Sequence, residues 1–212
     1  MIFVTSLNIT GMKKMNFPLV GLLAIAVMAF ISIEPLSIGS SLPEPAKEMM
    51  DITGKKVSFS DVMKKNGLLV MFSCNTCPVV GRYQSRTLET ARVATANDIG
   101  VILLNSNEAT RDNGDSFEDM QRYGKDQGYD FSYVLDKNSV MANAFGATRT
   151  PEVFLFDNKG KLVYHGAIDD NANGPDKVTR QHIRIAIEEL AAGRQISTTK
   201  TRFVGCTIKR VS

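Results

Sequence analysis

The sequence predicts one α/β domain, a central mixed sheet flanked by helices, behind an apolar N-terminal segment. Two continuous apolar runs, at 68–72 and 101–104, indicate buried strands because they have no polar face to show water. Apolar residues at helical spacing between 78 and 97 indicate a helix that joins these strands. A strand, a helix and a parallel strand form a crossover unit, which is normally right-handed. With 212 residues, the chain suits one domain plus a leader.

The elements before the crossover are short. Residues 51–59 predict an extended pair around a turn at 53–55, which contains Gly54. Ser60 is expected to cap a short helix that runs through Lys65.

The second half predicts an inserted helical section, then a β-hairpin and a last helix. The expected elements are helix 117–125, strand 131–135, helix 139–145, strands 153–156 and 162–164, and helix 179–192. Gly193 follows the last helix, as a C-terminal cap would. The tail from 194 shows little periodicity, so no element is expected there. This order is that of a thioredoxin fold with a helical insertion before the hairpin.

The N-terminus has the pattern of a targeting segment. Lys13 and Lys14 precede an uncharged apolar stretch at 17–33, which is at the short edge of the roughly 17–25 residues that span a bilayer. We predict a signal peptide or an N-terminal membrane anchor over 1–41, and a redox domain with its tail over 42–212. The domain is then exported to the periplasm or another extracytoplasmic compartment, where disulfides persist.

The charge and the cysteine content narrow the classes of protein to which this chain could belong. The chain has 25 basic and 22 acidic residues, which does not suggest a nucleic-acid partner. Three cysteines, Cys74, Cys77 and Cys206, are too few for a disulfide framework, so a hydrophobic core must hold the fold.

Cys74 and Cys77 follow the first buried strand directly and are separated by two residues. At a strand-to-helix junction, backbone N–H groups without partners and the helix dipole favour a thiolate. The thiolate is the nucleophile of disulfide exchange. We predict a redox dithiol in which Cys74 attacks and Cys77 resolves, with no organic cofactor. An inert disulfide and half of a metal site are the alternatives, and a structural zinc site would need more ligands.

Thr150-Pro151 opens the predicted hairpin strand, where proline is tolerated. Together with the upstream dithiol, this predicts a cis peptide bond that faces the cysteines. The backbone of Thr150 would then pair with a substrate, a thiol or disulfide of a protein or small molecule, like an added strand. The alternative is an ordinary trans proline.

Residues 42–212 resemble the thioredoxin-like redoxins of the alkyl hydroperoxide reductase and thiol-specific antioxidant superfamily. The matching segments are 72–78, 105–107, 150–151, 154–157, 164–171 and 205–209. The resemblance implies a thioredoxin fold, antioxidant or thiol–disulfide chemistry, and a redox partner that is a membrane protein if the chain is anchored. Many relatives have a cysteine just before Thr-Pro, where this chain has Arg149, so any role of that thiol is lost.

The superfamily also includes peroxidases, whose reactive cysteine ends a Pro-x-x-x-Thr-x-x-Cys motif. When Cys77 is placed as that cysteine, Cys74 falls where threonine belongs and Val70 where proline belongs. A thiol is a poor substitute for the threonine hydroxyl. A thiol peroxidase that uses Cys77 is therefore an alternative function.

Three further features have both a functional and a plain interpretation. Cys206 can resolve an oxidised Cys77, but we prefer a tail cysteine packed as a small apolar group. His165 can join the two cysteines in a copper-binding module, but we prefer an ordinary strand histidine. The acidic residues between 112 and 119, Asp115 among them, are expected to be solvated, and no carboxylate is assigned as proton acceptor.

Overall fold

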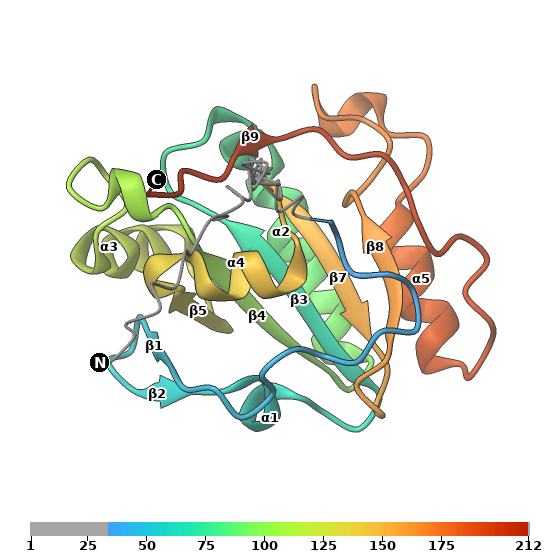
Figure 1. Cartoon of the computed structure of the whole chain (residues 1–212). Helices are drawn as coiled ribbons and strands as arrows, with labels where there is room; N and C mark the ends of the chain where they lie inside the picture. Colours follow the sequence, from blue (N-terminus) through green and yellow to red (C-terminus); the bar gives the residue numbers. More distant parts are fainter. Residues whose placement is uncertain (1–33, 212) are drawn as a thin grey trace, which may run out of the picture. The chain divides into compact units, whose positions relative to one another are not determined.

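The computed structural model describes residues 34–211 (Figure 1). Most of the predicted signal peptide or anchor lies outside these residues. The strands are β1 Met49–Asp51, β2 Lys56–Val57, β3 Gly67–Ser73, β4 Ile99–Asn105, β5 Ser132–Leu135, β6 Arg149–Thr150, β7 Glu152–Phe156, β8 Leu162–Gly166 and β9 Cys206–Thr207. The helices are α1 Phe59–Val62, α2 Pro78–Ala96, α3 Phe117–Gln127, α4 Val140–Phe145 and α5 His182–Ala191. Seven strands form one mixed sheet in the order β2-β1-β5-β4-β3-β7-β8, as the α/β prediction requires.

The predicted crossover forms the centre of the sheet. β3 and β4 pair in parallel along their whole length, from Gly67 opposite Ile99 to Ser73 opposite Asn105. Every residue of both strands is buried, which explains why their sequences are continuous apolar runs.

Alternate side chains of β3 enter two separate cores. Leu69 and Met71 pack with residues of α2 and α5, whereas Val70 and Phe72 pack with α1 and α4. The period of two along a strand sends neighbouring side chains to opposite faces. The sheet therefore lies between two helical layers, which the thioredoxin fold predicts.

The hairpin carries the cis peptide bond between Thr150 and Pro151, so that prediction is confirmed. β7 follows Pro151 and pairs antiparallel with β3, with Glu152 opposite Phe72. This register brings Pro151 to the end of β3 where the cysteine loop begins.

The inserted section differs from the prediction in one respect. It contains α3 and α4 as expected, but β5 between them joins the main sheet in parallel with β4, with Val134 opposite Leu104. Both Tyr133 and Val134 are buried, so this strand extends the core instead of covering it.

The tail also differs from the prediction. The absence of periodicity after 194 suggested no element, yet β9 pairs antiparallel with β6 in a separate two-stranded sheet. A strand of two residues is too short to produce an alternating pattern, which is why the sequence does not reveal it.

Smaller differences concern element ends. Ser58, not Ser60, caps α1, in a reciprocal arrangement with Asp61. α5 begins at His182 instead of 179. Before residue 42, the Leu36 N–H donates to Phe145 O at 3.0 Å. Within 34–211, none of the helices has the length and apolar character needed to cross a bilayer.

Candidate redox site

Cys77 occupies the N-cap position of α2, and Pro78 is the first helical residue. Proline suits this position because its missing N–H would have had no intrahelical partner. The free N–H groups of the following residues and the helix dipole favour negative charge at the N-cap. This is the environment that favours a thiolate, and it belongs to Cys77.

Cys74 lies before the helix, in the loop that leaves β3, and its side chain is fully buried. Its Sγ is 3.2 Å from the Thr150 Oγ1. Burial raises the pKa of the Cys74 thiol above its ordinary value; the Thr150 hydrogen bond opposes this by lowering the pKa, and the nearby Asp115 charge raises the pKa to a lesser degree. Of the two cysteines, Cys77 thus has the surroundings that favour a thiolate, whereas the sequence analysis assigns the attack to Cys74.

Cys77 is joined to Cys206 by a disulfide across 129 residues of sequence, with 6.1 Å between the Cα atoms. Cys74 is a free thiol. The preferred interpretation of Cys206 as a plain apolar tail residue was therefore wrong, and the disulfide is not the expected Cys74–Cys77 pair. The cause is the β6–β9 pairing, which places Cys206 opposite Thr150 and cannot be inferred from cysteine spacing.

Thr150 contacts both members of the predicted dithiol. Its hydroxyl lies beside Cys74, and its carbonyl oxygen is 3.5 Å from the Cys77 Sγ. Its backbone edge, the predicted place for a substrate strand, is paired with Cys206 of the tail. Cys74, Cys77, Thr150 and Cys206 thus meet at one point beside the cis proline.

Asp115 is a site residue that sequence reasoning missed. It was expected to be solvated, but it is fully buried and accepts five hydrogen bonds. The donors are the Asn75 N–H, the Thr76 hydroxyl, the side-chain amides of Asn105 and Asn107, and the Thr110 hydroxyl. Two of these donors lie between the cysteines, so Asp115 fixes the cysteine loop. The sequence signal that could have indicated this buried site is the group of polar residues directly after β4.

Glu152 and His165 form a second buried polar pair behind the cis proline. The His165 Nε2 is 2.8 Å from Glu152 Oε1, and the other carboxylate oxygen accepts the N–H groups of Thr148 and Arg149. The His165 ring also stacks on Phe154. The Nε2 of His165 is held by Glu152, whereas its buried Nδ1 has no hydrogen-bond partner. Within 34–211, no group of three or more His, Cys, Asp or Glu residues is arranged to hold a metal.

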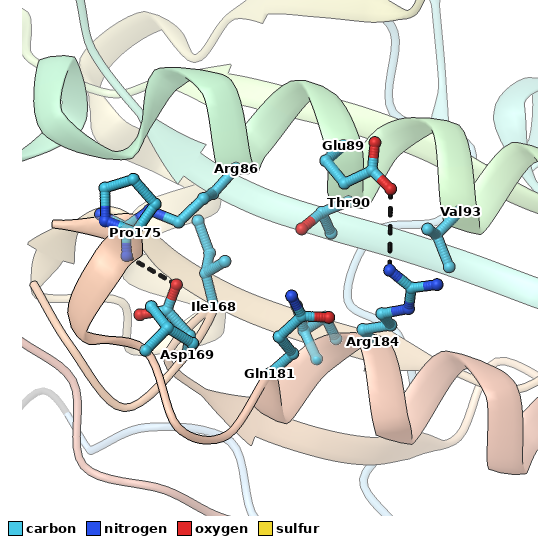
Figure 2. A pocket seen from close by; sticks show the side chains of 11 residues that line it. Arg86, Glu89, Thr90, Val93, Ile168, Asp169, Pro175, Gln181 and Arg184 are labelled. Carbon is cyan, nitrogen blue, oxygen red and sulfur yellow. Dashed lines mark hydrogen bonds and ion pairs between the residues drawn. The ribbon is translucent and has the colours of Figure 1, made fainter.

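A pocket between α2 and α5 lies apart from this site, since no cysteine lines it (Figure 2). Arg86 of α2 crosses it to Asp169, with 2.6 Å between Nη1 and Oδ2. Arg184 of α5 points toward Glu89, 3.7 Å away. Both arginines already have carboxylate partners, so the pocket presents no unpaired charge from these residues to a ligand.

Comparison with known proteins agrees with this geometry. A family model described as Redoxin matches residues 37–183. A conserved protein from Geobacillus kaustophilus is 31% identical, with a TM-score of 0.77 over 82% of this chain and 93% of that one. A protein from Sinorhizobium meliloti 1021 is 29% identical, with a TM-score of 0.76 over 84% of this chain and 97% of that one.

More distant structures share only the fold. The thioredoxin domain of a thiol-disulfide oxidoreductase from Bacteroides vulgatus is 22% identical, with a TM-score of 0.51 over 61% of this chain and 88% of that one. A search of curated protein sequences found no relative. Since the family model covers well over half of its length, the chain belongs to the redoxin family, a family of thiol-dependent oxidoreductases.

Proposed function

We propose that this redoxin is a thiol–disulfide oxidoreductase whose exchanging thiol is Cys77. One observation carries the proposal. Cys77, at the N-cap of α2, forms a disulfide with Cys206, and both Cys77 and the free thiol of Cys74 lie beside Thr150. A cysteine already bonded to one thiol, with another next to it, has the arrangement that disulfide exchange requires. The substrate is a thiol or disulfide of a protein or small molecule.

The thiols of Cys77 and Cys206 supply both electrons of the reaction. The Cys77 thiolate attacks a substrate disulfide, forms a mixed disulfide and releases one substrate thiolate. The Cys206 thiol then gives up its proton and attacks the Cys77 sulfur, which releases the second substrate thiol. Two electrons pass to the substrate, and the Cys77–Cys206 disulfide is left behind, as in the structure.

Three variants of the full chain, each with one cysteine replaced by serine, test this assignment. After reduction by excess dithiol and removal of the reductant, each variant is mixed with a small aromatic disulfide, and the release of coloured thiolate is followed. Cys77→Ser should abolish the fast release. Cys206→Ser and Cys74→Ser, as matched controls, should keep the first attack. If Cys74→Ser loses it while Cys77→Ser keeps it, the roles predicted from sequence are correct and this assignment is wrong.

A thiol peroxidase is the second candidate, and the Cys77–Cys206 disulfide also favours it. Peroxide would oxidise the Cys77 thiolate to a sulfenic acid, which condenses with the Cys206 thiol to a disulfide and water. The absence of the motif's threonine and proline argues against it, because Cys74 and Val70 stand at those positions. Rapid peroxide consumption by the reduced chain, without exchange with the aromatic disulfide, would favour this candidate.

The proposal includes export to an extracytoplasmic compartment, supported by the basic and apolar pattern of residues 13–33. A disulfide persists there, and a membrane redox partner would return the electrons. When the whole sequence is expressed, the redoxin domain should appear in an extracytoplasmic fraction, and its retention in the cytoplasm would contradict this part of the proposal.

A further inference from the structure

The tail after α5 runs along the open edge of β8 and then crosses to β6 (Figure 1). His165 donates its N–H to Thr199 O at 2.9 Å, and its carbonyl accepts the Thr201 N–H at 3.1 Å. Beyond this bridge, Cys206 lies opposite Thr150 in antiparallel register. The tail is thus held by backbone hydrogen bonds on both sides of the site.

β9 takes the position of an added substrate strand. In strand addition, backbone hydrogen bonds supply affinity and side-chain fit supplies selectivity. Cys206 lies opposite Thr150, and its sulfur is bonded to Cys77. The tail is therefore bound as an extended polypeptide would be when caught in a mixed disulfide with Cys77.

The contacts of Gly205 show which residue can precede the cysteine of a segment that pairs with Thr150 as β9 does. A Cβ at this position would lie 2.4 Å from the Thr150 carbonyl oxygen and 2.8 Å from the carbonyl carbon. Both are backbone atoms of a buried residue, so they cannot move aside cheaply. An occupant in this register needs glycine directly before its cysteine.

The neighbouring positions are unselective by comparison. The Arg149 guanidinium donates to the carbonyl of Gly205 at 3.0 Å, a backbone contact that does not depend on sequence. Val204 is 61% exposed, and Thr207 is also exposed. Next to the cysteine, selection is therefore strongest at the glycine, while two residues after the cysteine the 3% exposed Ile208 packs in the apolar core.

We propose that the C-terminal tail is an internal mimic of the substrate, and that the Thr150 edge accepts extended polypeptides with a Gly-Cys pair in the register of Gly205-Cys206. This inference rests on the proposed function of Cys77. It goes beyond it by naming the substrate class and the competing internal segment.

The test uses the full chain with Cys74→Ser and Cys206→Ser, so that Cys77 is the only thiol. Two peptides with the sequence of tail residues 202–209 are compared, one with glycine and one with alanine before the cysteine. Each peptide cysteine is activated as a mixed disulfide with a coloured aromatic thiol. The Cys77 thiolate attacks the peptide sulfur, the peptide–aromatic bond breaks, and the aromatic thiolate leaves. Its release gives the rate, and mass spectrometry confirms the adduct.

The glycine peptide should react about tenfold faster than the alanine peptide. Adding Gly205→Ala to the chain should displace the tail and speed the glycine peptide further. Gly81→Ala is the matched control, since a Cβ there meets no atom within 4 Å.

Equal rates for the two peptides, with normal reaction of a small aromatic disulfide, would overturn the inference alone. So would a Gly205→Ala chain that is folded and reacts at the unchanged rate. If Cys77 does not react even with the small disulfide, the proposed function fails and the inference falls with it.

Discussion

Cys74 and Cys77 are close in sequence but differ in what surrounds their sulfur atoms. Cys77 faces the free N–H groups at the start of α2, whereas Cys74 is buried and lies near the Asp115 carboxylate. The first environment stabilises a thiolate and the second stabilises a thiol. A two-residue spacing in sequence does not say which cysteine has which environment, so this difference could be described only from the structure.

This difference predicts distinct pH dependence for the two thiols. Because burial raises the pKa of Cys74 above its ordinary 9.0, its thiolate fraction should still be increasing at pH 9. The reactivity of Cys77 should reach its plateau at lower pH. The measurement is the alkylation rate against pH in chains that retain one cysteine each, with denatured protein as the control in which both titrate alike. Coincident profiles in the folded chains would contradict the prediction.

At the scale of elements, the loop between β3 and α2 is held by a side chain from a different loop. The carboxylate of Asp115 accepts the Asn75 N–H at 2.9 Å and the Thr76 hydroxyl at 2.8 Å. The remaining donors are Asn105, the last residue of β4, and Asn107 and Thr110 in the segment that follows it. The geometry of the site therefore depends on two strand ends being joined through one carboxylate.

Asp115→Asn should destabilise the chain by roughly 2–4 kcal/mol, because an amide group would face donors that now meet a carboxylate oxygen. It should also shift the alkylation of Cys74 to lower pH, since the Asp115 charge raises the pKa of that thiol. Asp112→Asn is the matched control, because Asp112 is exposed and should change stability by less than about 0.5 kcal/mol. Denaturant unfolding measures the stability of both variants, and the alkylation rate against pH measures the change at Cys74. Equal losses of stability for the two substitutions would show that the buried hydrogen bonds of Asp115 do not stabilise the fold.

Elements with a long pattern could be predicted from the sequence, and the contacts between distant short segments could not. The continuous apolar runs of β3 and β4 and the helical spacing in α2 each identify their element. The cis bond before Pro151 followed from the combination of hairpin and upstream dithiol. The two residues of β9 carry no periodic signal, and Asp115 looks like any loop acid until the fold buries it.

At the scale of the whole molecule, the Cys77–Cys206 disulfide closes most of the domain into one loop, since its two cysteines are 129 positions apart in the sequence. A cross-link of this span restricts the unfolded chain, and such bonds typically contribute about 2–4 kcal/mol. The oxidised and reduced chains should therefore differ measurably in stability.

Cys206→Ser should lower the free energy of unfolding of the oxidised chain by about 2–4 kcal/mol. Excess dithiol should remove the difference, since the wild-type chain then lacks the bond as well. Denaturant unfolding with and without dithiol makes the comparison. A deficit that persists under reducing conditions would mean that Cys206 acts through packing, not through the cross-link.

The attachment of β9 to the domain has a consequence for competition. Residues 192–205 tether β9 to the end of α5, so its local concentration at the Thr150 edge is fixed by the chain and does not fall on dilution. For short flexible connections such effective concentrations are of millimolar order, and the hydrogen bonds between His165 and the tail restrain β9 more than a flexible connection would. A free peptide with the same intrinsic affinity would have to approach that concentration to displace the tail. A dilute physiological substrate must therefore gain affinity from a second contact surface, or arrive when the tail has already left.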